Sequence, residues 1–78
     1  MIYCNIKNKT EKSAIYLFGT DIEDITGEAE FYSTFTEPKI LKQPKTSNVP
    51  AGWLSRLVVK YKESLVKGDF PEKMSYER

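Results

Sequence analysis

Residues 53–67 read WLSRLVVKYKESLVK, and this stretch decides the fold because its apolar side chains recur at helical spacing. Leu54 is followed by apolar residues three, four, seven and eleven positions further on, which is one face of an amphipathic helix. The members of this stripe are Leu54, Leu57, Val58, Tyr61 and Leu65. Pro50 fits the first turn of such a helix, and Gly68 is a favourable C-terminal cap. The pattern predicts a helix over about 50–67.

Upstream of this helix the apolar pattern changes to a period of two, which is typical of strands. Residues 2–7 alternate between apolar and polar, and residues 28–36 do so most clearly. Residues 14–19 form a nearly continuous apolar run, which predicts a central strand buried on both faces. Pro38 cannot donate to a central ladder, so any fourth strand, over 39–42, is short and lies at an edge.

This order of elements predicts an α+β fold. We expect a three- to four-stranded antiparallel sheet followed by one C-terminal amphipathic helix packed on one face. Residues 1–78 are expected to form a single small domain, since a domain usually takes about 100–200 residues. Gly27 is expected to make a tight turn with a positive φ. The polar tail, residues 72–78, is expected to fray.

The composition excludes several kinds of chemistry. Hydrophobic residues make up 40% and charged residues 29% of the 78, which is ordinary for a globular protein. With no histidine, zinc sites and catalytic triads that depend on imidazole are excluded. The single cysteine, Cys4, lies on the apolar face of the first strand and is expected to be a small buried side chain rather than a nucleophile. The sequence contains no glycine-rich phosphate loop, so we predict no catalytic residue and no cofactor.

The acidic segment between the second and third expected strands is a candidate site for a hard cation. Its carboxylates are Asp21, Glu23, Asp24, Glu28 and Glu30. A calcium loop needs oxygen ligands at alternate positions and a glycine where the loop turns sharply. Here the position after Glu23 in that alternation is Ile25, and the glycine comes too late. We expect a solvated acidic turn and no metal.

Features that report on compartment favour a cytoplasmic protein. The N-terminus lacks a basic leader followed by an apolar stretch, and the longest apolar-dominated run, 53–59, is too short to cross a bilayer. No membrane association is expected. Lysine outnumbers arginine ten to two, a bias of AT-rich genomes that points to a bacterium or its phage.

The predicted helix carries a set of cations that is the first candidate binding site. Its members are Arg56, Lys60, Lys62 and Lys67, against the single acid Glu63. Such cations could contact the phosphates of a nucleic acid, where each neutralised phosphate releases counterions. Ordinary amphipathic helices also place lysines on their outer side, and base recognition usually uses arginine, of which this chain has two. Nucleic acid is therefore the second choice of partner.

Two aromatic residues complete the predicted binding residues. Tyr32 alternates with the inward residues of its strand and is expected to face outward beside Glu30 and Thr34. Trp53 stands one position before the apolar stripe of the helix. Its side chain either packs against the end of the hydrophobic core or lies at a protein interface, where tryptophan is enriched.

Charge is distributed unevenly along the chain. Residues 1–39 hold four lysines and seven acids, a net charge of −3, whereas residues 40–78 hold eight basic and four acidic residues, a net charge of +4. The two halves either complement each other within one subunit, pair between subunits of a homodimer, or face a partner separately.

These observations favour a non-enzymatic protein-interaction module, of the size of small accessory, inhibitor or immunity proteins. It would bind another protein, or a second copy of itself, through the outer sheet face and the basic helix side. The alternative is a small nucleic-acid-binding protein that contacts phosphates through the basic helix.

Overall fold

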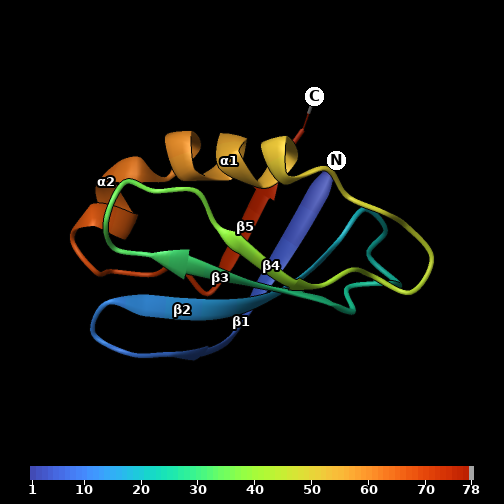
Figure 1. Ribbon diagram of the computed structural model, residues 1–78, viewed down its shortest axis with the longest axis horizontal. Coiled ribbons are helices and arrows are strands. Elements are labelled where there is room, and N and C mark those ends of the chain that lie inside the picture. The colour runs from blue at the N-terminus through green and yellow to red at the C-terminus, as the bar shows by residue number, and fades with distance from the viewer. Residues whose placement is uncertain (78) are drawn as a thin grey trace.

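Five antiparallel strands form one sheet within residues 1–77, the part of the chain that the computed structural model describes. They lie side by side in the order β4-β3-β2-β1-β5. The strands are β1 (Ile2–Lys9), β2 (Ser13–Gly19), β3 (Gly27–Tyr32), β4 (Lys39–Lys42) and β5 (Lys73–Tyr76). Two helices, α1 (Ala51–Lys60) and α2 (Lys62–Val66), cover one face of the sheet (Figure 1). The prediction of an α+β fold with an antiparallel sheet is confirmed.

The prediction of three to four strands and a frayed tail over 72–78 is wrong, because this segment contains β5. β5 pairs with β1 in antiparallel register, with Met74 opposite Cys4 and Ser75 opposite Tyr3. Met74 is 2% exposed and belongs to the core. A single inward methionine in a four-residue polar strand is too weak a pattern to predict. Arg78, the last residue of the predicted tail, lies outside the described residues.

The prediction of one helix over 50–67 is also wrong, because the helix is interrupted at Tyr61. The backbone of Tyr61 has φ −106° and ψ 20°, outside the helical range, although its N–H still donates to the Leu57 carbonyl oxygen at 2.9 Å. The Tyr61 hydroxyl accepts a hydrogen bond from the Ser75 N–H at 3.2 Å. The break therefore coincides with the point at which the helical layer bonds to β5.

The core lies between the sheet and the helices. The Tyr16 and Phe31 rings meet edge to face, with centroids 5.2 Å apart and an interplanar angle of 75°. The Tyr16 hydroxyl donates a hydrogen bond to the Pro71 carbonyl oxygen, just before β5. The helices bury four members of the predicted stripe: Leu54, Leu57, Val58 and Leu65. Helical spacing in the sequence therefore identified the buried side of both helices.

The opposite face of the sheet is left uncovered by the helices (Figure 1). Alternation along β2 places Ile15 and Leu17 on this open face, where both are half-buried. An ion pair joins Lys7 of β1 to Glu28 of β3, with 3.1 Å between Nζ and Oε1. The open face therefore mixes aliphatic and charged side chains.

The predicted tight turn at Gly27 is wrong, because this glycine begins β3 and its φ is not positive. A Cβ at this position would lie 2.8 Å from the Phe18 ring and 2.9 Å from Pro44 Cδ. Close packing therefore requires a glycine here. Gly68 is the glycine with a positive φ, 75°, among the described residues, as expected for the C-terminal cap.

Candidate functional site

Two of the cations predicted to bind a partner, Arg56 and Lys60, contact β5. Arg56 and Lys60 lie on the side of α1 that faces β5. The Arg56 guanidinium lies 5.9 Å from the centroid of the Tyr76 ring, and Lys60 Nζ donates to the Ser75 carbonyl oxygen at 2.7 Å. These two side chains are therefore partly held by β5, the strand that was not predicted.

Lys62 contacts a different part of the chain. Lys62 Nζ lies 4.8 Å from the centroid of the Phe35 ring, which belongs to the β3–β4 connection. Lys67 is the exposed C-terminal cap residue of α2. The structure thus places Lys62 toward the β3–β4 connection, away from the β5 contacts of Arg56 and Lys60.

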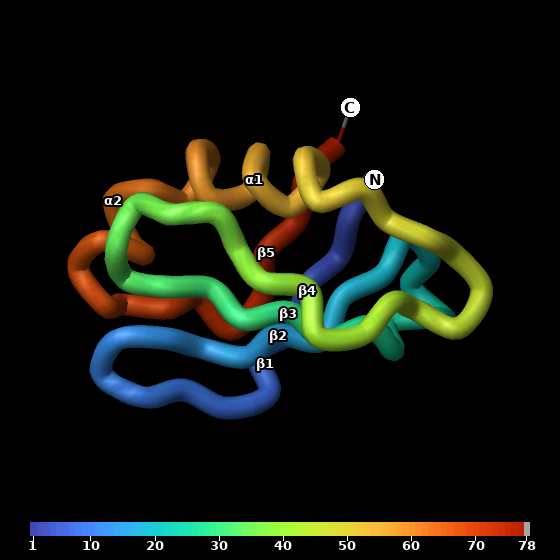
Figure 2. Tube along the Cα trace, viewed as in Figure 1, coloured from blue at the N-terminus to red at the C-terminus, as the bar shows by residue number. Residues whose placement is uncertain are grey.

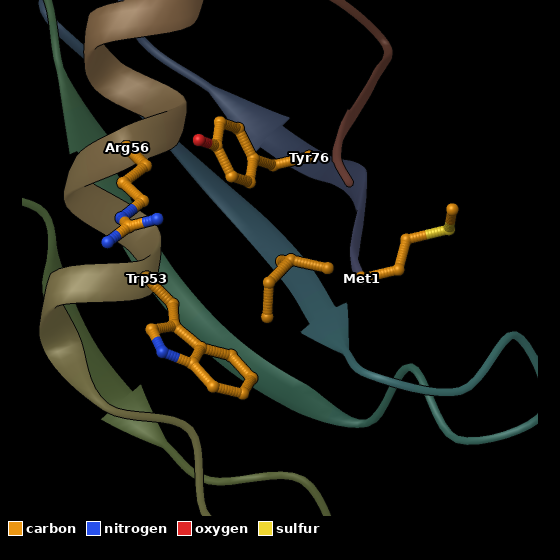
Figure 3. A pocket seen from close by; sticks show the side chains of 5 residues that line it. Met1, Trp53, Arg56 and Tyr76 are labelled. Carbon is orange, nitrogen blue, oxygen red and sulfur yellow. The ribbon is translucent and has the colours of Figure 1, made fainter. Parts of the chain in front are cut away.

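Trp53 is half-buried at the start of α1 and packs against the core. Figure 3 shows Trp53 and Arg56 projecting from the helix near Tyr76 and Met1. The hollow that these side chains enclose with Ile2 has a volume of only about 10 Å³, the room of a single water. This hollow offers no space for a ligand.

Tyr32 lies on the open face of the sheet, across the molecule from the helices. It pairs in register with Ser13 of β2, and its hydroxyl donates to Glu30 Oε1 at 3.3 Å. Desolvation and the neighbouring Glu30 carboxylate raise the pKa of Tyr32, so the phenol stays protonated near neutral pH. Tyr32 therefore cannot share one binding surface with the helix cations.

Sequence reasoning missed two exposed apolar residues that lie close together, one on α1 and one in the β3–β4 connection. Val59 is 65% exposed on α1, and Phe35 is 55% exposed. Phe35 was expected to face inward on a strand over 28–36, but β3 ends at Tyr32 and Phe35 lies in the following loop. One signal was available for Val59: it lies outside the apolar stripe that begins at Leu54.

Val59 stands between two shallow hollows. The first has a volume of about 160 Å³ and is mainly apolar, with Phe35 and Val58 in its lining. The second, of about 280 Å³, is lined by Val59 together with Arg56, Lys60 and Tyr76. The first hollow is also lined by Thr36, Glu37 and Ser55, so one carboxylate borders it. We use the name helix-layer surface for five residues that line the hollows together with Lys62, which contacts Phe35: Phe35, Arg56, Val59, Lys60, Lys62 and Tyr76.

The helix-layer surface combines apolar and cationic side chains. It presents two exposed apolar side chains and three cations, each of which lies over an aromatic ring. Cys4 lies in the core rather than on this surface, and burial raises the pKa of its thiol to about 12. A thiol that stays protonated at neutral pH is a poor nucleophile.

The acidic segment is held to another loop of the chain by hydrogen bonds to Asp24. Asp24 accepts hydrogen bonds from the Thr26 hydroxyl at 2.5 Å and from the N–H of Thr46 at 2.8 Å, and the Thr46 hydroxyl also donates to it. These bonds connect the loop 20–26 to the loop 43–50, which lie side by side in Figure 2. Within residues 1–77 no group of three or more potential metal ligands comes together.

No helix in the described part of the chain is long and apolar enough to cross a bilayer. Comparison with known proteins gave no match among family models, curated proteins or solved structures.

Proposed function

We propose that this protein is a non-enzymatic interaction module that binds another protein through the helix-layer surface. The observation that supports this most is the exposure of Val59 and Phe35 next to three cations. Protein interfaces combine aromatic and aliphatic anchors with arginine at their centre and charged groups at their rim. A role as an accessory, inhibitor or immunity protein is compatible with such a surface.

The chemistry of this surface defines the kind of partner. Arg56, Lys60 and Lys62 would attract an acidic surface and orient it as it approaches. An apolar side chain of the partner would fit the hollow between Phe35 and Val59. The partner expected is therefore a protein with an acidic patch around at least one exposed apolar side chain.

Nucleic acid remains the second candidate because Arg56 and Lys60 border one hollow together with an aromatic ring, that of Tyr76. Cations beside an aromatic side chain can hold phosphates and stack bases. Against this, the exposed side chains of Val59 and Phe35 offer no partner for a phosphate. Binding that rests on phosphates would weaken steeply as salt concentration rises.

A photo-crosslinking amino acid at position 59 separates these candidates. Irradiation in the cells that encode the protein is expected to yield a crosslink to one protein, unchanged by nuclease. The same amino acid at position 66 is the control, because Val66 is 51% exposed on α2 but does not line either hollow.

Three results would contradict the proposal in different ways. A crosslink that nuclease removes would move nucleic acid into first place. A crosslink to a second copy of this chain would identify a homodimer in place of a different partner. Equal crosslinking from positions 59 and 66 would show that the helix-layer surface is not the site.

A further inference from the structure

The open face of the sheet carries a pocket that is separate from the helix-layer surface. It lies where β1 and β5 meet the loop 20–26 and has a volume of about 340 Å³. Small-molecule sites commonly begin at about 300 Å³. The lining residues are Tyr3, Cys4, Asn5, Ile22, Ile25, Lys73, Met74 and Ser75. We call this the open-face pocket.

Gly19 makes this pocket possible. It pairs with Tyr3 at the end of β2, and a Cβ in its place would lie 1.9 Å from the Asp24 carbonyl oxygen. The loop 20–26 can therefore fold directly onto the sheet beside Tyr3, which only a glycine at this position allows. The result is a wall that carries Ile22 and Ile25.

Backbone and side-chain contacts hold the loop 20–26 in place. Residues Asp21 and Asp24 form an isolated antiparallel bridge that closes the turn of the loop. The Asp24 carboxylate is bound by Thr26 and Thr46, so the loop is anchored to a second loop of the chain. A ligand that enters the pocket therefore meets a largely pre-formed site, which reduces the entropy lost on binding.

The two sides of the pocket differ in chemistry. Tyr3, Ile22 and Ile25 form the apolar side, and Ile22 is 71% exposed, which is unusual for isoleucine. Lys73 lies opposite Asn5 in register, and Ser75 lies opposite Tyr3. These three polar residues supply an ammonium group, an amide and a hydroxyl, and the lining contains no carboxylate.

The polar groups of the pocket are not engaged within the protein. Among residues 1–77, the side chains of Asn5, Lys73 and Ser75 have no hydrogen-bond or ion-pair partner. One cation and two hydrogen-bonding groups facing an apolar wall complement a ligand that has an anionic end and an apolar body.

We propose that the open-face pocket binds a carboxylate that carries an adjacent apolar group, with the carboxylate at Lys73 and the apolar group against Ile22 and Ile25. Such a ligand is either a free amino-acid derivative or the C-terminus of a polypeptide. Both would present the same carboxylate and adjacent apolar group to the pocket. This site is independent of the helix-layer surface and of the partner proposed for it.

Ligand titration followed by NMR tests this site directly. The probes are N-acetyl-L-leucine, its neutral primary amide, and a hexapeptide with a free C-terminal leucine. The acid is expected to shift the amide signals of Tyr3, Ile22 and Lys73, with a dissociation constant on the order of millimolar for so small a ligand. The neutral amide is expected to bind at least about threefold more weakly, because it lacks the charge-assisted contact.

Two variants examine the two sides of the pocket. Lys73→Gln and Ile22→Ser should each weaken binding of the acid at least about threefold. Both positions are exposed, so the fold should survive these changes. Lys67→Gln and Val66→Ser are matched controls on α2 and should leave binding unchanged.

The hexapeptide distinguishes the two sources of the ligand. Binding at least tenfold tighter than that of N-acetyl-leucine indicates a polypeptide C-terminus, and equal binding indicates a small molecule. Equal shifts from acid and amide, or no shifts at the pocket at 10-fold the expected dissociation constant, would overturn the proposal.

Discussion

Asp24 shows how one side chain can organise a loop region at the scale of a single residue. Its carboxylate accepts hydrogen bonds from Thr26 and Thr46, and through them joins two loops that are about twenty positions apart in the chain. In sequence the same residue is one of several acids in a solvated turn. The sequence shows that Asp24 carries a carboxylate. It does not show that Thr46 binds this carboxylate, because that contact depends on tertiary structure.

The bonds to Asp24 make its contribution to stability depend on pH. Hydrogen bonds from the Thr26 side chain, followed by those from Thr46, lower the pKa of Asp24 from 3.8 to about 2. The ionised form is therefore favoured in the folded protein. Its stabilising effect is complete above pH 3.8 and is lost as the pH falls toward 2.

Thermal unfolding of the wild type and of Asp24→Asn at a series of pH values measures this effect. The wild type should have the higher midpoint at neutral pH, and the difference should shrink as the pH falls from 3.8 toward 2. Asp21→Asn is the control, and its difference from the wild type should vary less over this range. A difference for Asp24→Asn that does not change with pH would contradict the assigned hydrogen bonds.

At the scale of elements, β5 is the feature that most changes the expected fold. It forms an edge of the sheet, and an exposed edge strand risks pairing with other chains. Here the outward N–H and carbonyl groups of Ser75 bond to Tyr61 and Lys60 from the helical layer. The opposite edge, β4, is short, contains a bulge and carries Lys39 and Lys42. Both edges of the sheet are thereby protected.

Met74→Ala tests whether β5 belongs to the core. Truncation of a fully buried methionine should lower the free energy of unfolding by about 2–5 kcal/mol. Glu77→Ala, one residue beyond the strand and exposed, should change it by less than about 0.5 kcal/mol. Urea denaturation measures both, and equal small effects would mean that the tail is frayed after all.

Two glycines provide a second test of how the elements meet. Gly19→Ala should destabilise the protein by at least about 2 kcal/mol, because the new Cβ would lie 1.9 Å from the Asp24 carbonyl oxygen. Gly52→Ala should instead stabilise it by about 0.5–1 kcal/mol, since Gly52 is in α1 and nothing lies within 4 Å of its new Cβ. The same urea experiment decides, and similar effects for the two variants would contradict the placement of the loop 20–26.

The sequence predicts the elements that carry a regular pattern over enough residues. Alternation revealed β1 and β3, a nearly continuous apolar run revealed β2, and helical spacing revealed the buried stripe from Leu54 to Leu65. β5 was missed because its four residues contain one fully buried side chain. The break at Tyr61 was missed because it coincides with a contact to β5, which the helix sequence does not encode.

The candidate site was predictable only in part, for a related reason. Positions on the helix surface follow from spacing, so Arg56, Lys60 and Lys62 were found as exposed cations. The loop conformation after β3 does not follow from spacing, and that loop brings Phe35 beside Val59. The apolar component of the helix-layer surface thus required the three-dimensional structure.

At the scale of the whole molecule, the two proposed sites lie on different faces. The helical layer presents Val59 and Phe35 among cations, whereas the open face of the sheet presents the pocket beside Ile22 and Lys73. The sheet lies between them, so a substitution at one site should leave binding at the other unchanged. This separation allows each proposal to fail without affecting the other.

The most direct test of the proposed function is the affinity of the purified crosslinked partner for matched double variants. Isothermal titration with the variant Phe35→Ser/Val59→Ser should show binding at least about tenfold weaker than with the wild type. The variant Leu41→Ser/Val66→Ser, which also removes two exposed apolar side chains, should bind like the wild type. Equal affinities for the two double variants would contradict a binding site on the helix-layer surface.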